Sequence, residues 1–571
     1  MSTHRWSRAT IAAACLAAVA LPLAGTAAAA PVPTTAALAR TAPDTGAAAR
    51  PLAQLAPTPP MGWNDWSHYQ CGLTEQLITS TADTLVSTGL ADKGYRTVTL
   101  DDCWMATSRN SSGDLVADQG KFPHGLAWLG SYLHARGLQF GIYEDAGTST
   151  CGGYPGSWGH FAQDAKLFAS WGVDYLKLDG CNVPSVSGQT SEQTYRSAYA
   201  QQSQALAAAG RDIVFSESAP AYFQGTPAWY TVLGWVAQYG QLWREGYDIA
   251  TYDPNRPTAS RWGSVLGNYD YNHPLARYAG PGHWNDPDFV IAGDPGLTAD
   301  ESRSQTALWA MMAAPLILGA DVTALSQASI ATLGNADVIA VDQDSLGAQG
   351  SVVAQNGTVD VLAKPLAGGD RAVSLLNRGS SATTANTTVD AVGLLGGPGC
   401  SYSVKDLWSG ATSTSTGQFG ATIPAHGTAI LRVHPSAGCA AAQPTGQITG
   451  PGGKCLDDTM SSTADGSQII LYSCTANPNQ RMTLPGDGTV RVLGKCLGAA
   501  GGATSAGTAV QLFGCDGSGG QQWSYRQNGN LVNPQSGRCL DASGGGSADG
   551  TKIIIWSCGA NQANQIWSLP A

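Results

Sequence analysis

The sequence predicts a multidomain protein: a (β/α)8 barrel, then an antiparallel β-sandwich, then a domain made of three sequence repeats. Three observations support this prediction. Strand-like apolar runs alternate with helix-like patterns as far as residue 345. Short alternating strands follow, and a cysteine-containing unit then occurs three times. The length of 571 residues also favours several domains, since one domain typically has about 150 residues.

The N-terminus has the parts of a secretory signal peptide at residues 1–30. A positive start is followed by the apolar stretch 9–25 and by small residues that suit cleavage. A membrane anchor is the alternative, which the short apolar core disfavours. Residues 31–54 are rich in Ala, Thr and Pro and are predicted to be disordered. We therefore expect a secreted, extracellular protein without a membrane span.

Residues 55–345 alternate between strand-like and helix-like patterns, with helical periodicity at 76–90 and 194–209. Eight βα units in about 290 residues fit a closed barrel. An open, doubly wound sheet is the alternative, but no Gly-rich dinucleotide fingerprint follows the first strand. The strands are expected to end near the following residues: Gly62, Asp101, Tyr143, Asp179, Glu217, Trp243, Trp284 and Gly319.

Carboxylates stand at several of these strand ends. One apolar run ends in Asp179, an earlier run ends in Asp101 and Asp102, and Asp248 follows the strand expected at Trp243. Barrel enzymes keep their chemistry at the carboxyl ends of the strands. Carboxylates flanked by tryptophans at such a rim indicate sugar hydrolysis, which commonly uses two carboxyl groups.

Residues 346–436 change to short alternating strands punctuated by Gly, Asn and Ser, which predicts a small antiparallel sandwich. Cys400 and Cys439 are expected to pair within or beside it. Residues 437–446 are predicted to be a linker to the last domain, 447–571. The clearest sandwich strands are expected at 351–354, 359–363, 372–377 and 429–433.

The last domain contains three copies of one unit with a period near 42 residues. Each copy begins with Gly, a basic residue, Cys and Leu, and a second cysteine follows 19 residues after the first. The copies end in Gln-x-Trp or a related triplet. This domain resembles the ricin-B type β-trefoil of carbohydrate-binding module family 13. The predicted disulfides are Cys455–Cys474, Cys496–Cys515 and Cys539–Cys558.

Cysteine usage and charge exclude other classes of protein. Removal of the signal leaves twelve cysteines, and an even count in an exported protein implies disulfides. No CxxC or HxxxH spacing occurs, so neither a metal site nor a cofactor is predicted. The net charge of −11 argues against a nucleic-acid partner.

Ordered motifs of the barrel resemble glycoside hydrolase family 27, the α-galactosidase and α-N-acetylgalactosaminidase family. The resemblance implies a retaining glycosidase with Asp179 as nucleophile and Asp248 as acid/base. It also implies the disulfides Cys71–Cys103 and Cys151–Cys181 at the pocket rim. The motifs occupy residues 59–66, 100–104, 121–125, 141–143, 177–181, 243–248 and 282–288.

The two proposed carboxylates need opposite environments. Asp179 must be ionised, which the cation Lys177 on the same strand face favours. Asp248 must hold a proton at working pH, so partial burial or a like charge is expected to raise its pKa. Glu245 is a rival acid. The alternatives are that Asp179 only caps the following turn and that Asp248 is a helix cap or surface residue.

The resemblance also assigns contacts to the sugar. Asp101 and Asp102 accept hydrogen bonds from the 4- and 6-hydroxyls, although one of the pair could serve structure instead. Arg244 holds hydroxyls, and Trp66 and Trp104 offer apolar faces. The remaining substrate-binding residues are Tyr143, Lys177, Ser218, Ala221, Tyr222 and Asp286.

The loop at 215–222 is aligned with the specificity loop of the family. Strict galactosidases have Glu and Leu where Ser218 and Ala221 stand, and the N-acetylgalactosaminidases have Ser and Ala. Small residues leave room for an N-acetyl group, although lineage drift is the alternative explanation. Glu217 stands where the family often has a cysteine paired with one near Gly240, and it could perturb Asp179 or Asp248.

The trefoil resemblance implies sugar pockets built from an Asp, an aromatic platform and an Asn. Copy two has Gly498 in place of the Asp and keeps Phe513, so only copies one and three are expected to bind galactose- or xylose-type sugars. A purely structural trefoil is the alternative. The pocket residues are Asp457, Tyr472 and Asn479 in copy one, and Asp541, Trp556 and Asn564 in copy three.

Taken together, the sequence predicts a secreted retaining exo-α-galactosidase. It would remove terminal α-galactosyl residues from oligo- and polysaccharides, without metal or cofactor. Alternatives within the family are α-N-acetylgalactosaminidase, β-L-arabinopyranosidase and isomalto-dextranase. A non-catalytic carbohydrate-binding lectin is the alternative of another class.

Overall fold

The computed structural model describes residues 55–394, 399–436, 445–475, 477–485, 488–526, 529–559 and 562–570. The predicted signal peptide, the Ala/Pro-rich segment and most of the predicted linker lie outside these ranges. Cys439 does too, so the predicted Cys400–Cys439 pair falls outside the described residues.

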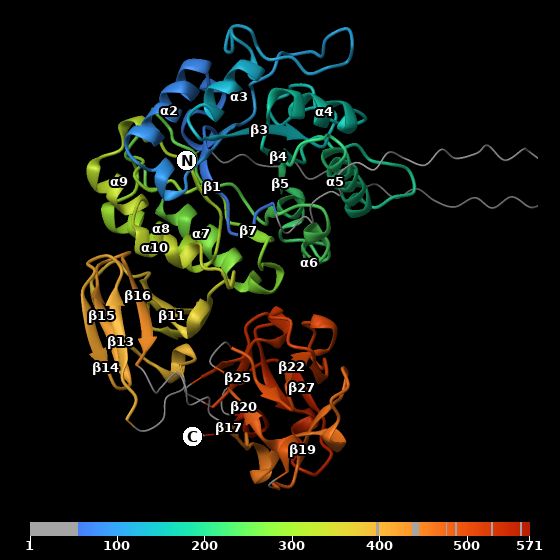
Figure 1. Cartoon of the computed structure of the whole chain (residues 1–571), viewed down its shortest axis with the longest axis vertical. Helices are drawn as coiled ribbons and strands as arrows, with labels where there is room; N and C mark the ends of the chain where they lie inside the picture. The colour runs from blue at the N-terminus through green and yellow to red at the C-terminus, as the bar shows by residue number, and fades with distance from the viewer. Residues whose placement is uncertain are drawn as a thin grey trace, which may run out of the picture. The chain divides into compact units, whose positions relative to one another are not determined.

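The first domain is the closed barrel that the sequence predicts (Figure 1). From β1 to β7 each strand pairs in parallel with the next, and β1 pairs with β8. Val290, in the segment after β7, pairs in parallel with Leu318 of β8. This bridge closes the ring of strands and excludes the open sheet. Every predicted strand end lies within two residues of the observed one. The strands are β1 Met61–Asn64, β2 Thr97–Leu100, β3 Gln139–Asp145, β4 Tyr175–Asp179, β5 Val214–Glu217, β6 Leu242–Arg244, β7 Trp284–Asp286 and β8 Leu316–Leu318.

Helices surround these strands (Figure 1). Two helices begin with a capping box, in which the side chain of the N-cap Thr accepts a hydrogen bond from the backbone N–H three residues later. Thr190 is the N-cap of α5, and Thr298 is the N-cap of α8. No helix of the described residues is long and apolar enough to cross a membrane. The helices are α1 Trp66–Tyr69, α2 Glu75–Ser87, α3 Leu126–His134, α4 Phe161–Trp171, α5 Ser191–Ala207, α6 Trp229–Leu233, α7 Trp262–Asn272, α8 Ala299–Met311, α9 Gln327–Leu333 and α10 Ala336–Asp342.

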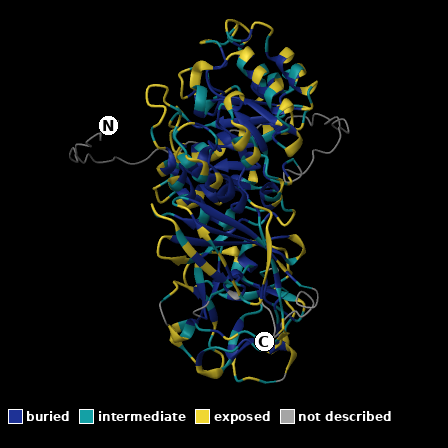
Figure 2. Cartoon of the chain, turned by 90° about the vertical axis from the view of Figure 1, so that its left-hand side faces the viewer, coloured by how far each residue is buried: buried dark blue, intermediate teal, exposed yellow. Residues whose placement is uncertain are grey.

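The barrel strands are buried on both faces, because helices cover the outside and side chains fill the inside (Figure 2). In β2, for example, all four residues are buried. Strands such as β3 and β8 therefore read in the sequence as apolar runs, whereas β2 also buries the hydroxyl-bearing Thr97 and Thr99. Polar side chains therefore concentrate where the strands end.

The second domain is antiparallel, as predicted, with a six-stranded sheet and a two-stranded sheet. The large sheet has the order β14-β13-β16-β11-β10-β9, and β12 pairs with β15. Its strands β11 and β16 contact α8, which explains why nearly every residue of that helix is buried. The strands are β9 Ser351–Asn356, β10 Val359–Pro365, β11 Arg371–Asn377, β12 Thr383–Thr388, β13 Tyr402–Asp406, β14 Thr412–Ser415, β15 Gln418–Ile423 and β16 Thr428–Pro435.

The third domain repeats one hairpin three times, as β18–β19, β22–β23 and β26–β27. A disulfide joins the two cysteines of each copy. The three copies meet at one side chain: the Gln468 amide nitrogen lies 2.7, 3.0 and 3.0 Å from the carbonyls of Ile469, Val510 and Ile553. The hairpin strands are β18 Cys455–Asp458, β19 Ile469–Tyr472, β22 Lys495–Ala499, β23 Val510–Phe513, β26 Arg538–Ala542 and β27 Ile553–Trp556.

Short strands connect these hairpins. They are β17 Thr445–Gly446, β20 Met482–Thr483, β21 Arg491–Val492, β24 Ser524–Tyr525 and β25 Leu531–Asn533.

One buried carboxylate breaks the threefold pattern. Asp458 ends β18 with 0% exposure, and neither of its carboxylate oxygens has a hydrogen-bond partner. The other two copies have Ala499 and Ala542 at the equivalent position. Burial, together with the charge of Asp457, raises the pKa of Asp458 to about 6. Its ionised form is therefore unfavourable in the folded domain.

Replacing Asp458 with alanine, as in the sister copies, is expected to stabilise the protein in a pH-dependent way. Because the folded pKa lies above the unfolded one, the penalty of Asp458 is absent at pH 3.5 and complete above pH 6, where it reaches about 2–3 kcal/mol. Calorimetry of the full chain should show a higher transition temperature for Asp458→Ala at pH 8 and little change at pH 3.5. An equal gain at both pH values would contradict this explanation.

Candidate active site

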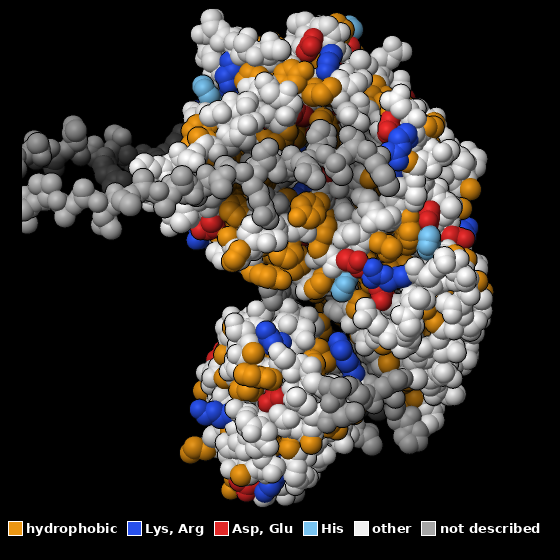
Figure 3. Space-filling view, turned by 180° about the vertical axis from the view of Figure 1, so that it is seen from behind, with side chains coloured by type: hydrophobic (Ala, Val, Ile, Leu, Met, Phe, Trp, Pro, Cys, Tyr) orange, Lys and Arg blue, Asp and Glu red, His pale blue; other side chains and the backbone are white. Residues whose placement is uncertain are grey.

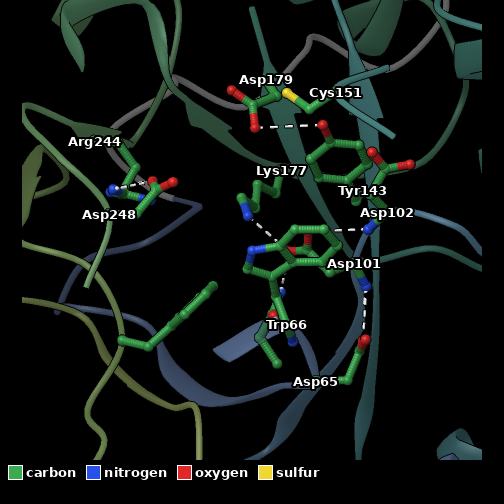
Figure 4. A network of polar contacts seen from close by, with 12 residues as sticks. Asp65, Trp66, Asp101, Asp102, Tyr143, Cys151, Lys177, Asp179, Arg244 and Asp248 are labelled. Carbon is green, nitrogen blue, oxygen red and sulfur yellow. Dashed lines mark hydrogen bonds and ion pairs between the residues drawn. The ribbon is translucent and has the colours of Figure 1, made fainter. Parts of the chain in front are cut away.

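The predicted carboxylates meet at one rim of the barrel, where the strands end (Figure 4). Asp101 and Asp102 follow β2, Asp179 ends β4, and Asp248 lies in the segment after β6. In Figure 4, Asp179 and the Arg244–Asp248 pair lie on two sides of Lys177. Asp179 is half-buried and Asp248 is exposed, so both are open to solvent.

Asp179 is the acceptor of three hydrogen bonds. The Tyr222 hydroxyl donates to its Oδ1 at 2.6 Å, and the Tyr143 hydroxyl lies 3.3 Å from its Oδ2. The Gly180 backbone donates to Oδ1 at 2.9 Å, so Asp179 also caps the turn, as the alternative interpretation expected. Burial and the Asp179 charge raise the pKa of both tyrosines, which therefore remain donors. Donors to a carboxylate favour its ionised form.

Lys177 is the central cation of the rim. Its ammonium donates to Asp101 Oδ2 at 2.6 Å, and both side chains are buried. Burial alone would lower the pKa of Lys177, but the charges of Asp101 and then Asp179 outweigh it and raise that pKa. Lys177 therefore stays charged and acts on Asp179 through space, while its direct partner is Asp101. Asn64 completes the Asp101 site by donating to Oδ2 at 2.7 Å.

Asp102 and Asp145 hold the loops of the rim. Asp102 accepts at 2.7 Å from the backbone of Cys103 and of Gly152, the residue after Cys151. Asp145 accepts from the Cys181 backbone at 2.8 Å. The disulfides Cys71–Cys103 and Cys151–Cys181 join these same segments. Asp102 therefore serves structure in this state, while its neighbour Asp101 pairs with Lys177.

Asp145 was missed from the sequence. Burial and the nearby Asp179 charge raise the pKa of Asp145 to about 9, so it carries a proton at neutral pH. Its position at the end of β3, two residues after Tyr143, follows the same pattern of strand-end carboxylates that identified the other residues. Applying that pattern to β3 would have found it.

Asp248 has the opposite electrostatics to those expected. Its side chain is 78% exposed, and Arg244 donates to its Oδ1 at 2.9 Å. Desolvation favours a raised pKa, but the Arg244 charge outweighs it and lowers the pKa of Asp248. The expectation of a raised pKa is therefore wrong, because the guanidinium four residues away stabilises the ionised form.

Asp288 positions the segment that carries Asp248. Its Oδ2 lies 3.1 Å from Arg244 and accepts from the Ile249 backbone at 2.7 Å. Asp286 instead lines a small cavity with Lys177 and Arg244, and burial raises its pKa to about 6. The sequence motif containing both carboxylates was recognised, but it did not indicate that Asp288 is the one that contacts Arg244.

Glu245 and Glu217 lie outside the rim. Glu245 is fully buried and accepts a hydrogen bond from Asn272. Burial raises the pKa of Glu245, but it also separates this carboxyl group from the solvent-exposed rim. Glu217 is buried against Gly240: a Cβ on that glycine would lie 2.5 Å from Glu217 Oε1. Glu217 thus occupies the space next to Gly240. Its raised pKa comes from burial rather than from Asp179 or Asp248.

The predicted aromatic and small residues divide into two groups. Trp66 is half-buried beside the rim, and Ser218 and Ala221 belong to the turn that presents Tyr222 to Asp179. Trp104, however, is fully buried, and its indole donates to the Tyr143 carbonyl at 2.8 Å. The expectation that Trp104 offers a face to the sugar is therefore wrong, because its ring packs in the core.

Copies one and three of the trefoil contain a similar set of polar contacts. In copy one, Gln480 donates to Asp457 at 2.7 Å, and Tyr472 is 44% exposed. In copy three, Gln565 donates to Asp541 at 2.7 Å, Asn564 donates to it at 2.8 Å, and Trp556 is 46% exposed. Buried Asn479 in copy one leaves its side-chain oxygen without a partner. In each of these two copies, one hairpin thus carries a hydrogen-bonded carboxylate and an exposed aromatic ring.

Copy two lacks this arrangement. A Cβ on Gly498 would lie 3.0 Å from Gln521 and 3.3 Å from Phe513, so the site has little room for a carboxylate. Gln521 donates to the Gly514 carbonyl at 2.8 Å, as Gln480 and Gln565 do to the carbonyls of Ser473 and Ser557. Copy two therefore keeps the backbone contact of the glutamine but lacks the carboxylate of the other two copies.

Comparison with known proteins agrees with this division into three parts. A family model described as "Alpha galactosidase A" matches residues 58–344, and "Alpha galactosidase C-terminal beta sandwich domain" matches residues 356–433. "Ricin-type beta-trefoil lectin domain" matches residues 444–567.

Relatives that match about two thirds of this chain or more point to the same family. The Alpha-galactosidase A of Aspergillus niger is 43% identical over 486 residues, covering 84% of this chain and 87% of the relative. Alpha-galactosidase I from Mortierella vinacea is 32% identical with a TM-score of 0.59, covering 66% of this chain and 97% of that structure. An alpha-galactosidase from Saccharomyces cerevisiae, solved with raffinose, is 29% identical with a TM-score of 0.60, covering 67% and 99%.

A closed barrel with carboxylates at its rim, followed by these two β-domains, defines a glycoside hydrolase. The chain belongs to the α-galactosidase family, glycoside hydrolase family 27, and carries a ricin-type β-trefoil in addition.

Proposed function

We propose that this protein is a retaining exo-α-galactosidase in which Asp179 is the nucleophile and Asp248 the acid/base. The observation that carries the proposal is that both carboxylates stand at the same rim of the barrel, Asp179 at the end of β4 and Asp248 after β6 (Figure 4). Asp179 is held by Tyr143 and Tyr222 as an acceptor, whereas Asp248 stands exposed beside Arg244. The family relationship supports the same activity.

In the first step, an Asp179 oxygen attacks the anomeric carbon, and Asp248 gives its proton to the departing glycosidic oxygen. A covalent galactosyl ester with Asp179 forms, and the rest of the substrate leaves as an alcohol. In the second step, Asp248 takes a proton from water, and the resulting hydroxyl displaces Asp179. The charge of Lys177 stabilises the leaving carboxylate.

Galactose and N-acetylgalactosamine are both compatible with the small residues of the specificity loop. Ser218 is buried and Ala221 is half-buried, and neither side chain has the bulk of the Glu and Leu of strict galactosidases. A missing contact of this kind changes selectivity by about 1–3 kcal/mol. α-N-acetylgalactosaminidase is therefore the second candidate, and rates on the two matching nitrophenyl glycosides distinguish them.

The added trefoil supports a polymeric substrate, and the disulfides support an extracellular location. A carbohydrate-binding domain attached to an exo-glycosidase raises the effective concentration of polymeric substrate at the active site. We propose α-galactosyl ends of oligo- and polysaccharides as substrates, and an extracellular location for the enzyme, in keeping with the disulfides of the barrel and trefoil.

The two catalytic roles are tested by azide rescue. Asp179→Ala is expected to lower kcat on nitrophenyl α-galactoside by about 10⁴-fold or more. Azide should then restore turnover and give the β-galactosyl azide. Asp248→Ala should lose about 10²–10⁴-fold on substrates with poor leaving groups and give the α-azide. Asp92→Ala, an exposed carboxylate before β2, is the control and should behave as wild type. Wild-type rates for Asp179→Ala would refute the assignment.

The pH profile tests the influence of Arg244. Because Arg244 lowers the pKa of Asp248, the acid form is confined to acidic pH, and kcat/KM is expected to fall as pH rises. Arg244→Gln should move the basic limb of kcat/KM to higher pH, while the maximal rate falls because substrate contacts are lost. If the limb stays in place, another group is the acid.

The trefoil pockets are tested by affinity electrophoresis of the full-length Asp179→Ala protein in gels containing galactan or xylan. Tyr472→Ala and Trp556→Ala should each reduce retardation, and the double variant should abolish it, because each removes an exposed aromatic platform. Phe513→Ala in copy two is the matched control and should change nothing. Unchanged retardation of the double variant would leave the trefoil with a structural role only.

A further inference from the structure

The segment that carries the proposed acid rests on one side of α7. The Tyr271 hydroxyl donates to the Tyr247 carbonyl at 2.8 Å, and Asn268 donates to the same oxygen at 3.4 Å. Gly246 packs directly on the Tyr271 ring, since a Cβ on this glycine would lie 2.4 Å from two of the ring carbons. Asp248 comes next in the chain, so the position of its carboxyl group depends on where α7 lies.

The last residue of α7 lies on the same side of the helix. Asn272 is fully buried and donates to the carboxyl group of Glu245. Asn268, Tyr271 and Asn272 are three or four residues apart, which places them on one face of the helix. That face therefore holds residues 245–247, directly before the proposed acid.

Two residues between them contact the β-sandwich instead. The Arg378 guanidinium, directly after β11, donates to the two carboxylate oxygens of Asp270 at 2.8 and 2.7 Å. It also donates to Asp360 of β10 at 3.2 Å, and the buried Tyr269 hydroxyl donates to that carboxylate at 3.2 Å. One side of α7 thus holds the acid-bearing segment, and another side is fixed by the sandwich.

The pair of Arg378 and Asp270 is suited to fixing an orientation. Two parallel hydrogen bonds from one guanidinium restrict a carboxylate more than a single bond does. The hydrogen bonds and charge of Asp270 raise the pKa of Arg378, so the guanidinium stays charged. Charged side chains are sparse on the surface of the protein, and basic ones lie beside acidic ones (Figure 3). Because the two side chains are 30% and 44% exposed, the pair contributes little to folding stability.

We propose that Arg378 is a positioning residue for the acid: through Asp270 and α7 it holds Asp248 where a proton can pass to the leaving group. This inference rests on the proposed function, in which Asp248 is the acid. A displacement of about 1 Å can lower a rate by about 10²-fold, so a small shift of α7 is measurable. The donors to Asp179 come from β3 and from the turns after β4 and β5, so the nucleophile should stay in place.

The test compares a leaving group that needs an acid with one that does not. Arg378→Gln is expected to lower kcat/KM on methyl α-galactoside about tenfold, because methoxide must be protonated as it departs. On 2,4-dinitrophenyl α-galactoside, kcat/KM should stay within about twofold, because this phenolate leaves without a proton. Arg378→Lys keeps the charge without the fork and should give an intermediate rate on the methyl glycoside.

Lys405→Gln is the matched control. Lys405 also joins the sandwich to the barrel, through Asp337 of α10 at 2.7 Å, and its exposure is similar to that of Arg378. This variant should leave both rates unchanged. Asp270→Asn should reproduce the pattern of Arg378→Gln, and the double variant should be no worse than either single one, because all three remove the same contact.

The outcomes separate the inference from the function on which it rests. Equal losses on both substrates, no loss on the methyl glycoside, or the same loss in Lys405→Gln would overturn the positioning role and leave the galactosidase assignment intact. If Asp248→Ala itself lowers both rates equally, or if wild type hydrolyses neither substrate, the proposed function fails.

Discussion

The buried ion pair between Lys177 and Asp101 is the interaction on which the site depends. The pair crosses from β4 to the end of β2 inside the barrel, and each partner makes the burial of the other possible. Removing one partner of such a pair typically costs about 3–5 kcal/mol, because a buried charge is left uncompensated. The same ammonium also interacts with the charge of Asp179, so one cation serves both the buried pair and the proposed nucleophile.

The barrel could be predicted from the sequence because its strands are buried on both faces and read as apolar runs. The functional carboxylates could be found because such runs end abruptly in Asp179 and Asp101. The sequence could not supply the pKa of Asp248, which depends on how Arg244 turns, nor the role of Asp288, which depends on contacts with another loop. The predicted role of Trp104 as a face for the sugar was wrong for a similar reason, since proximity in sequence does not determine which way a ring points.

The trefoil shows what symmetry constrains and what it leaves free. The contacts of Gln468 with three equivalent carbonyls require all copies to keep one backbone geometry. Outside that centre, the copies diverge: Asp458 replaces an alanine in one, and Gly498 replaces a pocket carboxylate in another. The absence of that carboxylate is therefore compatible with an intact fold, because Gln468 and the carboxylates are different side chains.

The two disulfides at the rim have a consequence for how the enzyme must be made. Cys151–Cys181 and Cys71–Cys103 join the segments that position Asp145, Asp102 and the end of β4. In a reducing compartment these bonds do not persist. A chain synthesised in the cytosol of an ordinary bacterial host would keep its hydrophobic barrel but lack the covalent ties around its catalytic groups. Production through an oxidising export route should therefore yield more active molecules per folded chain.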